Sequence, residues 1–204
     1  MIGIIDYGLG NLRAFANIYK LLNIPFIIAS KATDLVNVSK VILPGVGVFD
    51  QAMKRLQDSG MRECLNEIAL DKKLPVIGIC VGMQILTCLS EEGILRGLEW
   101  IDGDTKKLST ASVDEPMCIP HMGWNDVRPL KDNNLFKGLG EGSRFYFLHS
   151  YYVRCDKSED ALAVTTYGEE FVCAINHKNI YGVQFHPEKS HRHGIRLLKN
   201  FSEL

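Results

Sequence analysis

The sequence predicts an α/β fold with a mostly parallel, doubly wound central sheet, flanking helices and additional antiparallel strands. In the first half of the chain, short apolar strand-like runs alternate with helical patterns, which is typical of a parallel sheet. In the second half, strand-like segments follow one another with turn residues between them, which favours antiparallel strands. A chain of 204 residues with 46% apolar residues can bury one substantial core, so we expect a single domain over residues 1–204.

Strands and helices alternate in the expected order of the first half. Apolar runs predict strands at residues 2–6, 26–29, 41–43 and 74–79. Apolar residues at helical spacing predict helices at residues 11–22 and 49–70, and a further helix is expected at residues 81–89. In a doubly wound sheet the ligand crevice lies beyond the carboxyl ends of the parallel strands. Cys80 follows the fourth of these strands, so we expect it at that crevice.

The second half is expected to be largely β. Its strand candidates are bounded by turn residues and cover residues 101–108, 124–127, 144–148, 151–155, 162–166, 171–175 and 180–185. A closing helix is predicted for residues 191–201. No repeat, low-complexity stretch or linker interrupts the chain, which favours one mixed domain.

Charge and hydropathy exclude several classes of function. The net charge is −1, and no block of lysine and arginine is long enough to follow a phosphate backbone, so we expect no nucleic-acid partner. The first apolar run is too short for a signal-peptide core, and no run approaches the roughly 20 residues of a membrane span. We therefore expect no membrane association and a cytoplasmic protein.

Six cysteines are spread along the sequence without a C-x-x-C pair or a metal-like spacing to histidine. In a reducing compartment they should be free thiols, and no metal site is expected. Five of them lack flanking glycines, and packing as small apolar side chains is the simpler interpretation of their role. Only Cys80 differs.

Cys80 has the surroundings of a catalytic nucleophile. It follows an apolar strand and precedes a predicted helix, with Gly78 and Gly82 two residues away on each side. Such a strand-to-helix corner is sharp enough to strain the nucleophile's backbone, and glycine neighbours avoid a collision. Backbone amides at the start of the helix would favour the thiolate and offer donors to an oxyanion. The pattern predicts a reactive cysteine.

His186 and Glu188 supply the other two groups that thiolate catalysis needs. A base must take the thiol proton, and a third group must orient that base. His186 ends an apolar strand, and Glu188 follows two residues later with Pro187 stiffening the link. Taken alone, a histidine near a strand end is more often a surface or packed core residue. Together with the glycine-framed cysteine, the three residues predict a Cys-His-Glu triad.

A second glycine-rich segment, residues 43–49, follows the third strand. Gly45 and Gly47 permit unusual peptide orientations, so a backbone N–H could point at an oxyanion, although a tight turn is the simpler alternative. A phosphate loop is less favoured than either, because no Gly-Lys-Ser/Thr follows. A dinucleotide site at residues 8–13 is excluded because Arg13 occupies the third glycine position.

These motifs resemble those of the triad, or class I, glutamine amidotransferases, and the resemblance covers essentially the whole chain. It rests on the segments 78–84 and 185–188, and the segments 6–12, 43–47, 120–125 and 186–190 resemble glutaminase subunits of histidine biosynthesis. The resemblance implies hydrolysis of glutamine to glutamate and ammonia without a cofactor. Cys80 would attack the side-chain amide, His186 would transfer protons, and Glu188 would orient His186.

The resemblance also implies an oxyanion hole and a glutamine pocket. The oxyanion donors would be the N–H groups of Val81 and Val46, and a peptide flip could be needed to aim the latter. Positions that match glutamine-binding residues of the family are Gly47, Gln84, Glu92, Ser150 and Tyr151. Two alternatives stay open from the residues themselves. Glu92 could be a solvated charge at a helix end, and Ser150 and Tyr151 could be ordinary strand residues.

Ammonia released into water is protonated and lost as a nucleophile, so the resemblance implies a separate acceptor enzyme. That partner would be a (β/α)8-barrel cyclase that forms a heterodimer with this chain and makes imidazole glycerol phosphate and AICAR. Asn11, Trp124 and Lys189 match interface positions of the family, although each could be ordinary surface.

Three alternatives remain at this level. A close relative could instead supply ammonia to a sugar amidotransferase in surface polysaccharide synthesis. A cysteine hydrolase or peptidase could use the same triad on another acyl group. A non-enzymatic protein could use Cys80 as a redox sensor or structural thiol, but this function needs neither His186 nor Glu188.

Overall fold

The central sheet has eight strands and matches the predicted fold class. A computed structural model describes residues 1–109, 118–140 and 142–204. The strand order is β2-β1-β3-β4-β13-β12-β11-β8, in which the first five strands are parallel and the others antiparallel. Their bounds are β1 Ile2–Ile5, β2 Phe26–Ala29, β3 Lys40–Gly45, β4 Val76–Cys80, β8 Arg128–Pro129, β11 Ala161–Tyr167, β12 Glu169–His177 and β13 Ile180–Val183.

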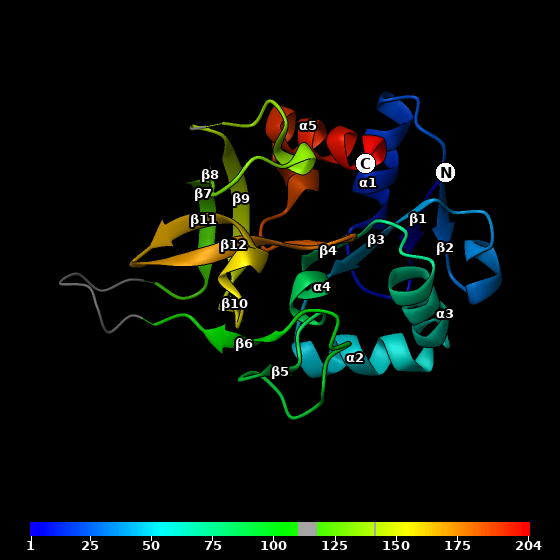
Figure 1. Ribbon diagram of the computed structural model, residues 1–204, viewed down its shortest axis with the longest axis horizontal. Helices are drawn as coiled ribbons and strands as arrows, with labels where there is room; N and C mark the ends of the chain where they lie inside the picture. Colours follow the sequence, from blue (N-terminus) through cyan, green and yellow to red (C-terminus); the bar gives the residue numbers. More distant parts are fainter. Residues whose placement is uncertain (110–117, 141) are drawn as a thin grey trace.

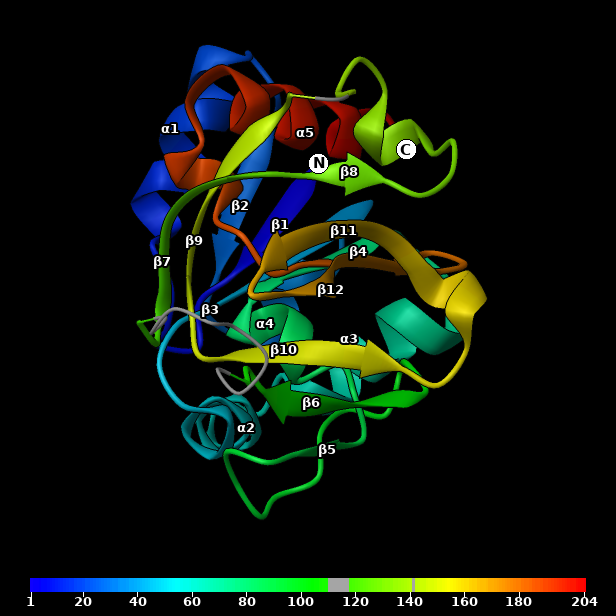
Figure 2. The ribbon, with the colours of Figure 1, turned by 90° about the vertical axis from the view of Figure 1, so that its left-hand side faces the viewer.

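Two smaller sheets lie on the side of the molecule that holds β11 and β12, away from β1 and β2 (Figures 1 and 2). One sheet has the order β10-β6-β5, with β10 at Tyr151–Cys155, β6 at Gly103–Lys107 and β5 at Leu89–Ser90. The other is an antiparallel pair formed by β7, His121–Asp126, and β9, Arg144–His149. The predicted strands of the second half are present with shifted ends, whereas the short strands β5 and β8 were not predicted.

Helices cover both faces of the central sheet (Figure 1). Helices α1, Leu12–Leu21, and α5, His191–Glu203, lie together on one face, and the Tyr19 hydroxyl donates to the Leu198 carbonyl at 3.2 Å. Helices α2, Phe49–Asp58, and α3, Arg62–Asn66, lie on the other face. The strands β1 and β4 are buried along their whole length, which explains their continuous apolar sequence.

The prediction of one continuous helix over residues 49–70 is wrong, because the structure has separate helical segments there. Helix α2 ends at Asp58, and α3 begins at Arg62 and leads into a π-helical turn, η2, at Glu67–Asp71. Gly60 lies between α2 and α3 with φ +70°, a left-handed conformation that stops a right-handed helix. The glycine is therefore a helix end that apolar periodicity alone does not reveal.

The predicted helix at residues 81–89 is also wrong, because α4 spans only Val81–Gln84. The Thr87 hydroxyl donates to the Gln84 carbonyl at 2.8 Å, and the chain then turns into β5. A Cβ on Gly97 would collide with the Thr87 carbonyl, so another segment already occupies the path of a longer helix. Besides these helices, the described residues form short 3-10 turns. They are η1 Ala32–Leu35, η3 Asn134–Phe136, η4 Ser158–Asp160 and η5 Pro187–Lys189.

Candidate active site

The strained corner that the sequence predicts is present at Cys80. Cys80 is the last residue of β4 and has φ +55° and ψ −114°, which is an unfavourable backbone conformation for a residue with a side chain. A Cβ on Gly78 would lie closer than 3.0 Å to the Gly82 backbone, and a Cβ on Gly82 would collide with the Leu43 carbonyl. Only glycine fits at these two positions, because β3, β4 and α4 approach there backbone to backbone.

One cavity of about 620 Å³ collects almost every predicted site residue. It lies beyond the carboxyl ends of β3 and β4, where a doubly wound sheet forms its ligand crevice. The lining includes every residue predicted for the triad, the oxyanion hole and glutamine binding. The full lining is Gly10, Asn11, Val46, Gly47, Cys80, Val81, Gln84, Glu92, Pro120, Leu148, His149, Ser150, Tyr151, His186, Glu188 and Lys189. Of the predicted residues, only Trp124 lies outside this lining.

His186 and Glu188 form a buried pair. His186 Nδ1 lies 2.9 Å from Glu188 Oε1, and the two side chains are 4% and 2% exposed. The backbone of His186 is held on both sides, because its N–H donates to the Tyr146 carbonyl at 2.8 Å and its own carbonyl accepts from the Ser190 hydroxyl at 2.6 Å. The imidazole therefore has a defined position and a carboxylate on Nδ1, which leaves Nε2 for proton exchange.

The pKa of His186 is raised from 6.5 to about 10. Burial by itself lowers this pKa, but hydrogen bonds and charge interactions with Cys80 and Glu188 act in the opposite direction and outweigh it. Glu188 Oε2 is buried without a hydrogen-bond partner among the described residues. One carboxylate oxygen of Glu188 is thus bound to His186, and the other has no hydrogen bond among the described residues.

The segment predicted to contribute to an oxyanion hole lies directly beside Cys80. Gly45 pairs with Cys80 in the parallel register of β3 and β4, and Val46 and Gly47 continue onto the cavity wall. Gly47 has φ +96°, a conformation that favours glycine, and Val46 is 39% exposed. The structure thus brings Val46 and Gly47 to the same cavity as Val81.

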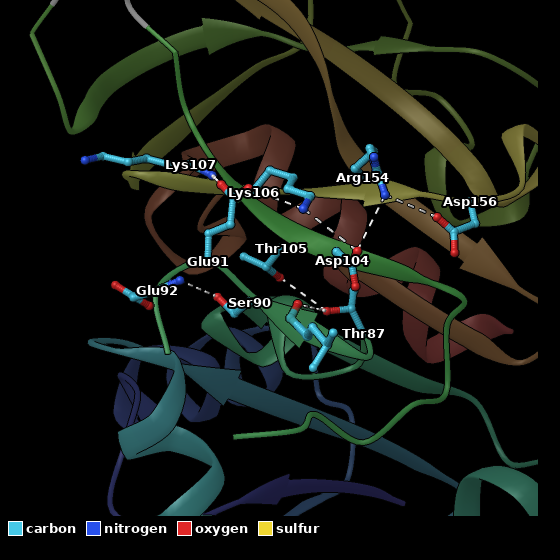
Figure 3. A network of polar contacts seen from close by, with 11 residues as sticks. Thr87, Ser90, Glu91, Glu92, Asp104, Thr105, Lys106, Lys107, Arg154 and Asp156 are labelled. Atoms are coloured by element: carbon cyan, nitrogen blue, oxygen red, sulfur yellow. Dashed lines mark hydrogen bonds and ion pairs between the residues drawn. The ribbon is translucent and has the colours of Figure 1, made fainter. Parts of the chain in front are cut away.

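Glu92 lies in a loop and caps α2, so the helix-end interpretation from the sequence is wrong. Its Oε2 accepts from the Phe49 N–H at 2.8 Å, and its own N–H donates to Ser90 Oγ at 3.1 Å. Figure 3 shows the side chains of Glu92 and Glu91 pointing in different directions. The carboxylate of Glu91 accepts from the Lys107 N–H. Burial raises the pKa of Glu92, which the Phe49 N–H partly offsets. A half-buried carboxylate at the cavity wall is suited to a cationic group of a ligand.

The three predicted interface residues lie at the rim of the cavity or near it. Asn11 is the exposed N-cap of α1, and Lys189 is exposed in η5 with its ammonium 5.4 Å from the ring centre of Tyr146. Trp124 is 39% exposed in β7 and stacks on His191 at 5.2 Å between ring centres. These side chains form an exposed aromatic and basic surface next to the site.

Sequence reasoning missed two groups of site residues. Gln184 donates to Cys80 Sγ at 3.6 Å, and its position two residues before His186 at a strand end was the available signal. His149 lines the cavity and bonds to His121 at 3.1 Å, and both side chains are buried. Burial lowers the pKa of His121 to about 4 and that of His149 to about 3. No spacing in the sequence brings these two histidines together.

The site and fold define a class. The chain matches the family model described as Glutamine amidotransferase class-I over residues 4–203, and it belongs to that family. It is 54% identical to Imidazole glycerol phosphate synthase subunit HisH of Bdellovibrio bacteriovorus and 50% identical to that of Leptospira borgpetersenii. Both alignments cover 100% of each chain.

Solved structures support the fold. The chain matches a crystal structure described as a glutamine amidotransferase with a TM-score of 0.75 and 18% identity, covering 99% of this chain and 97% of that one. A glutamine amidotransferase of Thermotoga maritima matches with a TM-score of 0.64 and 19% identity, covering 99% of this chain and 82% of that one. The class I amidotransferase fold predicted from the sequence is thereby confirmed.

The described residues hold neither a membrane-spanning helix nor a cluster of metal ligands. Residues 1–109, 118–140 and 142–204 contain no helix with the length and apolar character needed to cross a membrane. Within the same ranges, no three histidine, cysteine, aspartate or glutamate side chains are grouped as metal ligands would be.

Proposed function

We propose that the chain is the glutaminase subunit of an imidazole glycerol phosphate synthase. It hydrolyses glutamine to glutamate and ammonia, and it passes the ammonia to a separate cyclase subunit that makes imidazole glycerol phosphate and AICAR. Full-length relatives named as this subunit support the proposal. The observation that carries it is the convergence of Cys80, His186 and Glu188 on one cavity together with the residues expected to bind glutamine.

In the proposed reaction, the thiol proton of Cys80 has passed to His186, and the resulting thiolate attacks the side-chain carbonyl carbon of glutamine. The tetrahedral intermediate has its negative charge on the former carbonyl oxygen, where the N–H groups of Val81 and Val46 would donate to it. His186 then gives its proton to the leaving nitrogen, and ammonia departs as the C–N bond breaks. A glutamyl thioester remains, which water hydrolyses to glutamate with His186 as base. Glu188 holds His186 through Nδ1.

Glutamine binding is proposed to use the loop and strand residues that line the cavity. The carboxylate of Glu92 is suited to the α-ammonium group of glutamine, because it is half-buried and negatively charged. Ser150 and Tyr151 line the same cavity at the junction of β9 and β10, and Gly47 lines it beside the oxyanion segment. Gln84 contributes by donating to the Tyr151 carbonyl at 3.0 Å, which positions that segment.

The ammonia acceptor is proposed to be a (β/α)8-barrel cyclase docked over the cavity mouth. Asn11, Trp124 and Lys189 would contact it at the rim described above. Exposed apolar side chains continue this surface, since Met122 is 65% exposed and Leu148 is 38% exposed. Docking there would cover the exit of the cavity, so that ammonia is not protonated in bulk water. We place the reaction in the cytoplasm, where the free cysteines of the described chain stay reduced.

The proposal is tested by measuring glutamate release from the chain alone and with candidate acceptor enzymes. We expect a cyclase subunit with its nucleotide ligand to raise the rate strongly, and a sugar amidotransferase partner to have no effect. Cys80→Ala should abolish glutamine-dependent synthesis while ammonia-dependent synthesis by the complex persists, and the exposed Cys118→Ala serves as control. Glutamine turnover by Cys80→Ala would reject the nucleophile. Stimulation by the sugar enzyme alone would reject the pathway.

A further inference from the structure

Three hydrogen bonds connect the backbone carbonyl of Tyr151, on the cavity wall proposed to bind glutamine, to the Cys80 sulfur. Gln84 Nε2 donates to the Tyr151 carbonyl at 3.0 Å and to Gln184 Oε1 at 3.1 Å. Gln184 Nε2 then donates to Cys80 Sγ at 3.6 Å. Both glutamine side chains are buried, with Gln84 2% and Gln184 0% exposed. Two buried amides thus lie in series between the wall and the nucleophile.

The donor-to-acceptor direction of these hydrogen bonds follows from the first acceptor, the Tyr151 carbonyl. A backbone carbonyl can only accept, so Gln84 must present its amide nitrogen to Tyr151. The same nitrogen donates its second hydrogen to Gln184, and the facing atom of Gln184 must therefore be its oxygen. The NH₂ group of Gln184 then faces the sulfur. The flipped amide would oppose two NH₂ groups and turn a carbonyl oxygen toward Cys80, which excludes it.

The sheet places Gln184 beside the nucleophile. Strand β13 is the parallel neighbour of β4, with Val183 opposite Ile79, so the next residues of the two strands are Gln184 and Cys80. The Gln184 N–H donates to the Cys173 carbonyl of β12 at 2.8 Å, which holds its backbone in the sheet. His186 lies two residues further along the same segment. The segment at the end of β13 therefore supplies both the proposed base, His186, and a side-chain donor to the Cys80 sulfur, Gln184.

We propose that Gln184 is a positioning residue that holds the Cys80 sulfur for attack and stabilises its thiolate. Gln84 and the Tyr151 carbonyl set the orientation of this donor. The inference rests on the proposed function of Cys80 as nucleophile and adds a residue to that site.

The contacts of the sulfur explain why this donor matters on ionisation. In the thiol form, the S–H group can donate to the Leu148 carbonyl at 3.8 Å. When the proton leaves, the sulfur has nothing to donate and the carbonyl oxygen faces a negative charge. An N–H donor to the same sulfur becomes stronger at that moment, because hydrogen bonds to charged groups exceed those to neutral ones. Gln184 thus offsets the unfavourable contact with Leu148.

Alkylation of Cys80 by iodoacetamide tests the proposal, because the thiolate is the reacting species. The reaction is followed across a range of pH by mass spectrometry of the Cys80 peptide, with exposed Cys118 as internal reference. We expect Gln184→Met to slow alkylation of Cys80 at neutral pH by about 10- to 100-fold, as loss of one hydrogen bond to an anion implies. The rate–pH curve of Cys80 should move to higher pH, and that of Cys118 should not.

A second variant keeps the test informative if Gln184→Met folds poorly. Gln184→Glu has nearly the same shape but replaces the donor by a negative charge, so it should slow alkylation more than Gln184→Met. Asn200→Leu is the matched control, because Asn200 is a buried amide of α5 that donates to Leu135 at 2.9 Å and Lys137 at 2.8 Å. A merely structural role of a buried amide predicts equal effects of the Gln184 and Asn200 variants on Cys80.

The Gln84→Met variant tests whether Gln84 acts on the Cys80 sulfur through Gln184. This variant should also slow alkylation, and the double variant should be no slower than Gln184→Met alone, because Gln84 acts on the sulfur through Gln184. Wild-type rates and pH dependence in folded Gln184→Met and Gln184→Glu would overturn the proposal. Failure of the proposed function would show in a different measurement: Cys80→Ala would still hydrolyse glutamine, whereas alkylation of Cys80 in the Gln184 variants would be slowed as expected.

Discussion

The proton on His186 is held by two neighbours that act against the effect of burial. Burial lowers the pKa of an imidazole, whereas Cys80 and Glu188 raise that of His186 to about 10. The histidine therefore keeps a proton near neutral pH when both neighbours are in place. Such a proton is available to the leaving nitrogen of glutamine, and this links the geometry of the pair to the second half of the proposed reaction.

Glu188→Gln tests this residue-scale argument. The amide keeps the shape but removes the negative charge, so we expect a lower pKa of His186 and a kcat reduced by about 10²- to 10⁴-fold. NMR titration of the His186 ring measures the first effect, and glutamate release with the partner present measures the second. An unchanged His186 titration would contradict the role given to Glu188.

The raised pKa of His186 also predicts a pH dependence of stability. Between 6.5, the ordinary value, and about 10, the folded chain holds a proton that the unfolded chain has lost. This contribution to stability is fully present below 6.5 and is lost as pH rises through about 10. Urea unfolding should therefore show wild-type stability falling with pH across this window more steeply than that of Glu188→Gln. Parallel curves for the two proteins would refute the linkage.

At the scale of elements, the corner between β4 and α4 depends on backbone contact. Gly82→Ala places a Cβ against the Leu43 carbonyl of β3, and we expect a loss of about 2–4 kcal/mol in the free energy of unfolding. Gly60→Ala is the control, because a Cβ there meets no atom within 4 Å. Its φ of +70° should cost about 1–2 kcal/mol. Urea unfolding compares the two, and equal losses would show that the collision is relieved.

The loop before β6 and the start of α2 are joined by two carboxylates with separable roles. Glu92 accepts from the Phe49 N–H, and Asp50 accepts from the N–H groups of Ile94 and Leu95. Glu92→Gln keeps an acceptor for Phe49 but loses the charge, so we expect little change in stability and a KM for glutamine raised about 10- to 100-fold. Because burial raises the pKa of Glu92, KM should also increase toward acid pH.

Asp50→Asn is the control for this prediction, since Asp50 lies outside the cavity lining. It should lower stability modestly and leave KM unchanged. Steady-state kinetics and urea unfolding of both variants separate substrate binding from capping. An unchanged KM in Glu92→Gln would remove Glu92 from the proposed glutamine pocket.

The sequence predicts the site better than it predicts the elements around it. The predicted residues Cys80, His186 and Glu188 meet at one cavity because their motifs are local and strand ends meet at one edge of a parallel sheet. The helix over residues 49–70 was wrong because Gly60 adopts a left-handed conformation that apolar spacing does not encode. The buried contact between Gln184 and Cys80 depends on the pairing of β13 with β4, which single-sequence patterns do not specify.

At the scale of the whole molecule, the cavity and the proposed docking surface share the same end of the sheet. The exposed tryptophan Trp124 belongs to β7, whereas Lys189 follows the triad residue Glu188 directly in η5. Trp124 and Lys189 both approach Tyr146 of β9, at 6.1 Å between ring centres and 5.4 Å from the ammonium to the ring. The Tyr146 carbonyl also accepts from the His186 N–H at 2.8 Å. A partner that contacts this surface therefore lies one hydrogen bond away from the proposed base.

Trp124→Ala tests whether this surface binds the cyclase. A large aromatic side chain at the centre of an interface often contributes about 2 kcal/mol or more, so we expect the Kd for the cyclase to rise about 30-fold or more. The stacking partner His191 would lose its contact, but it is exposed and stays on α5. Leu21→Ala is the control, since Leu21 is 69% exposed at the opposite end of α1 from Asn11. Titration calorimetry measures both affinities, and equal Kd values for the two variants would place the partner on another face.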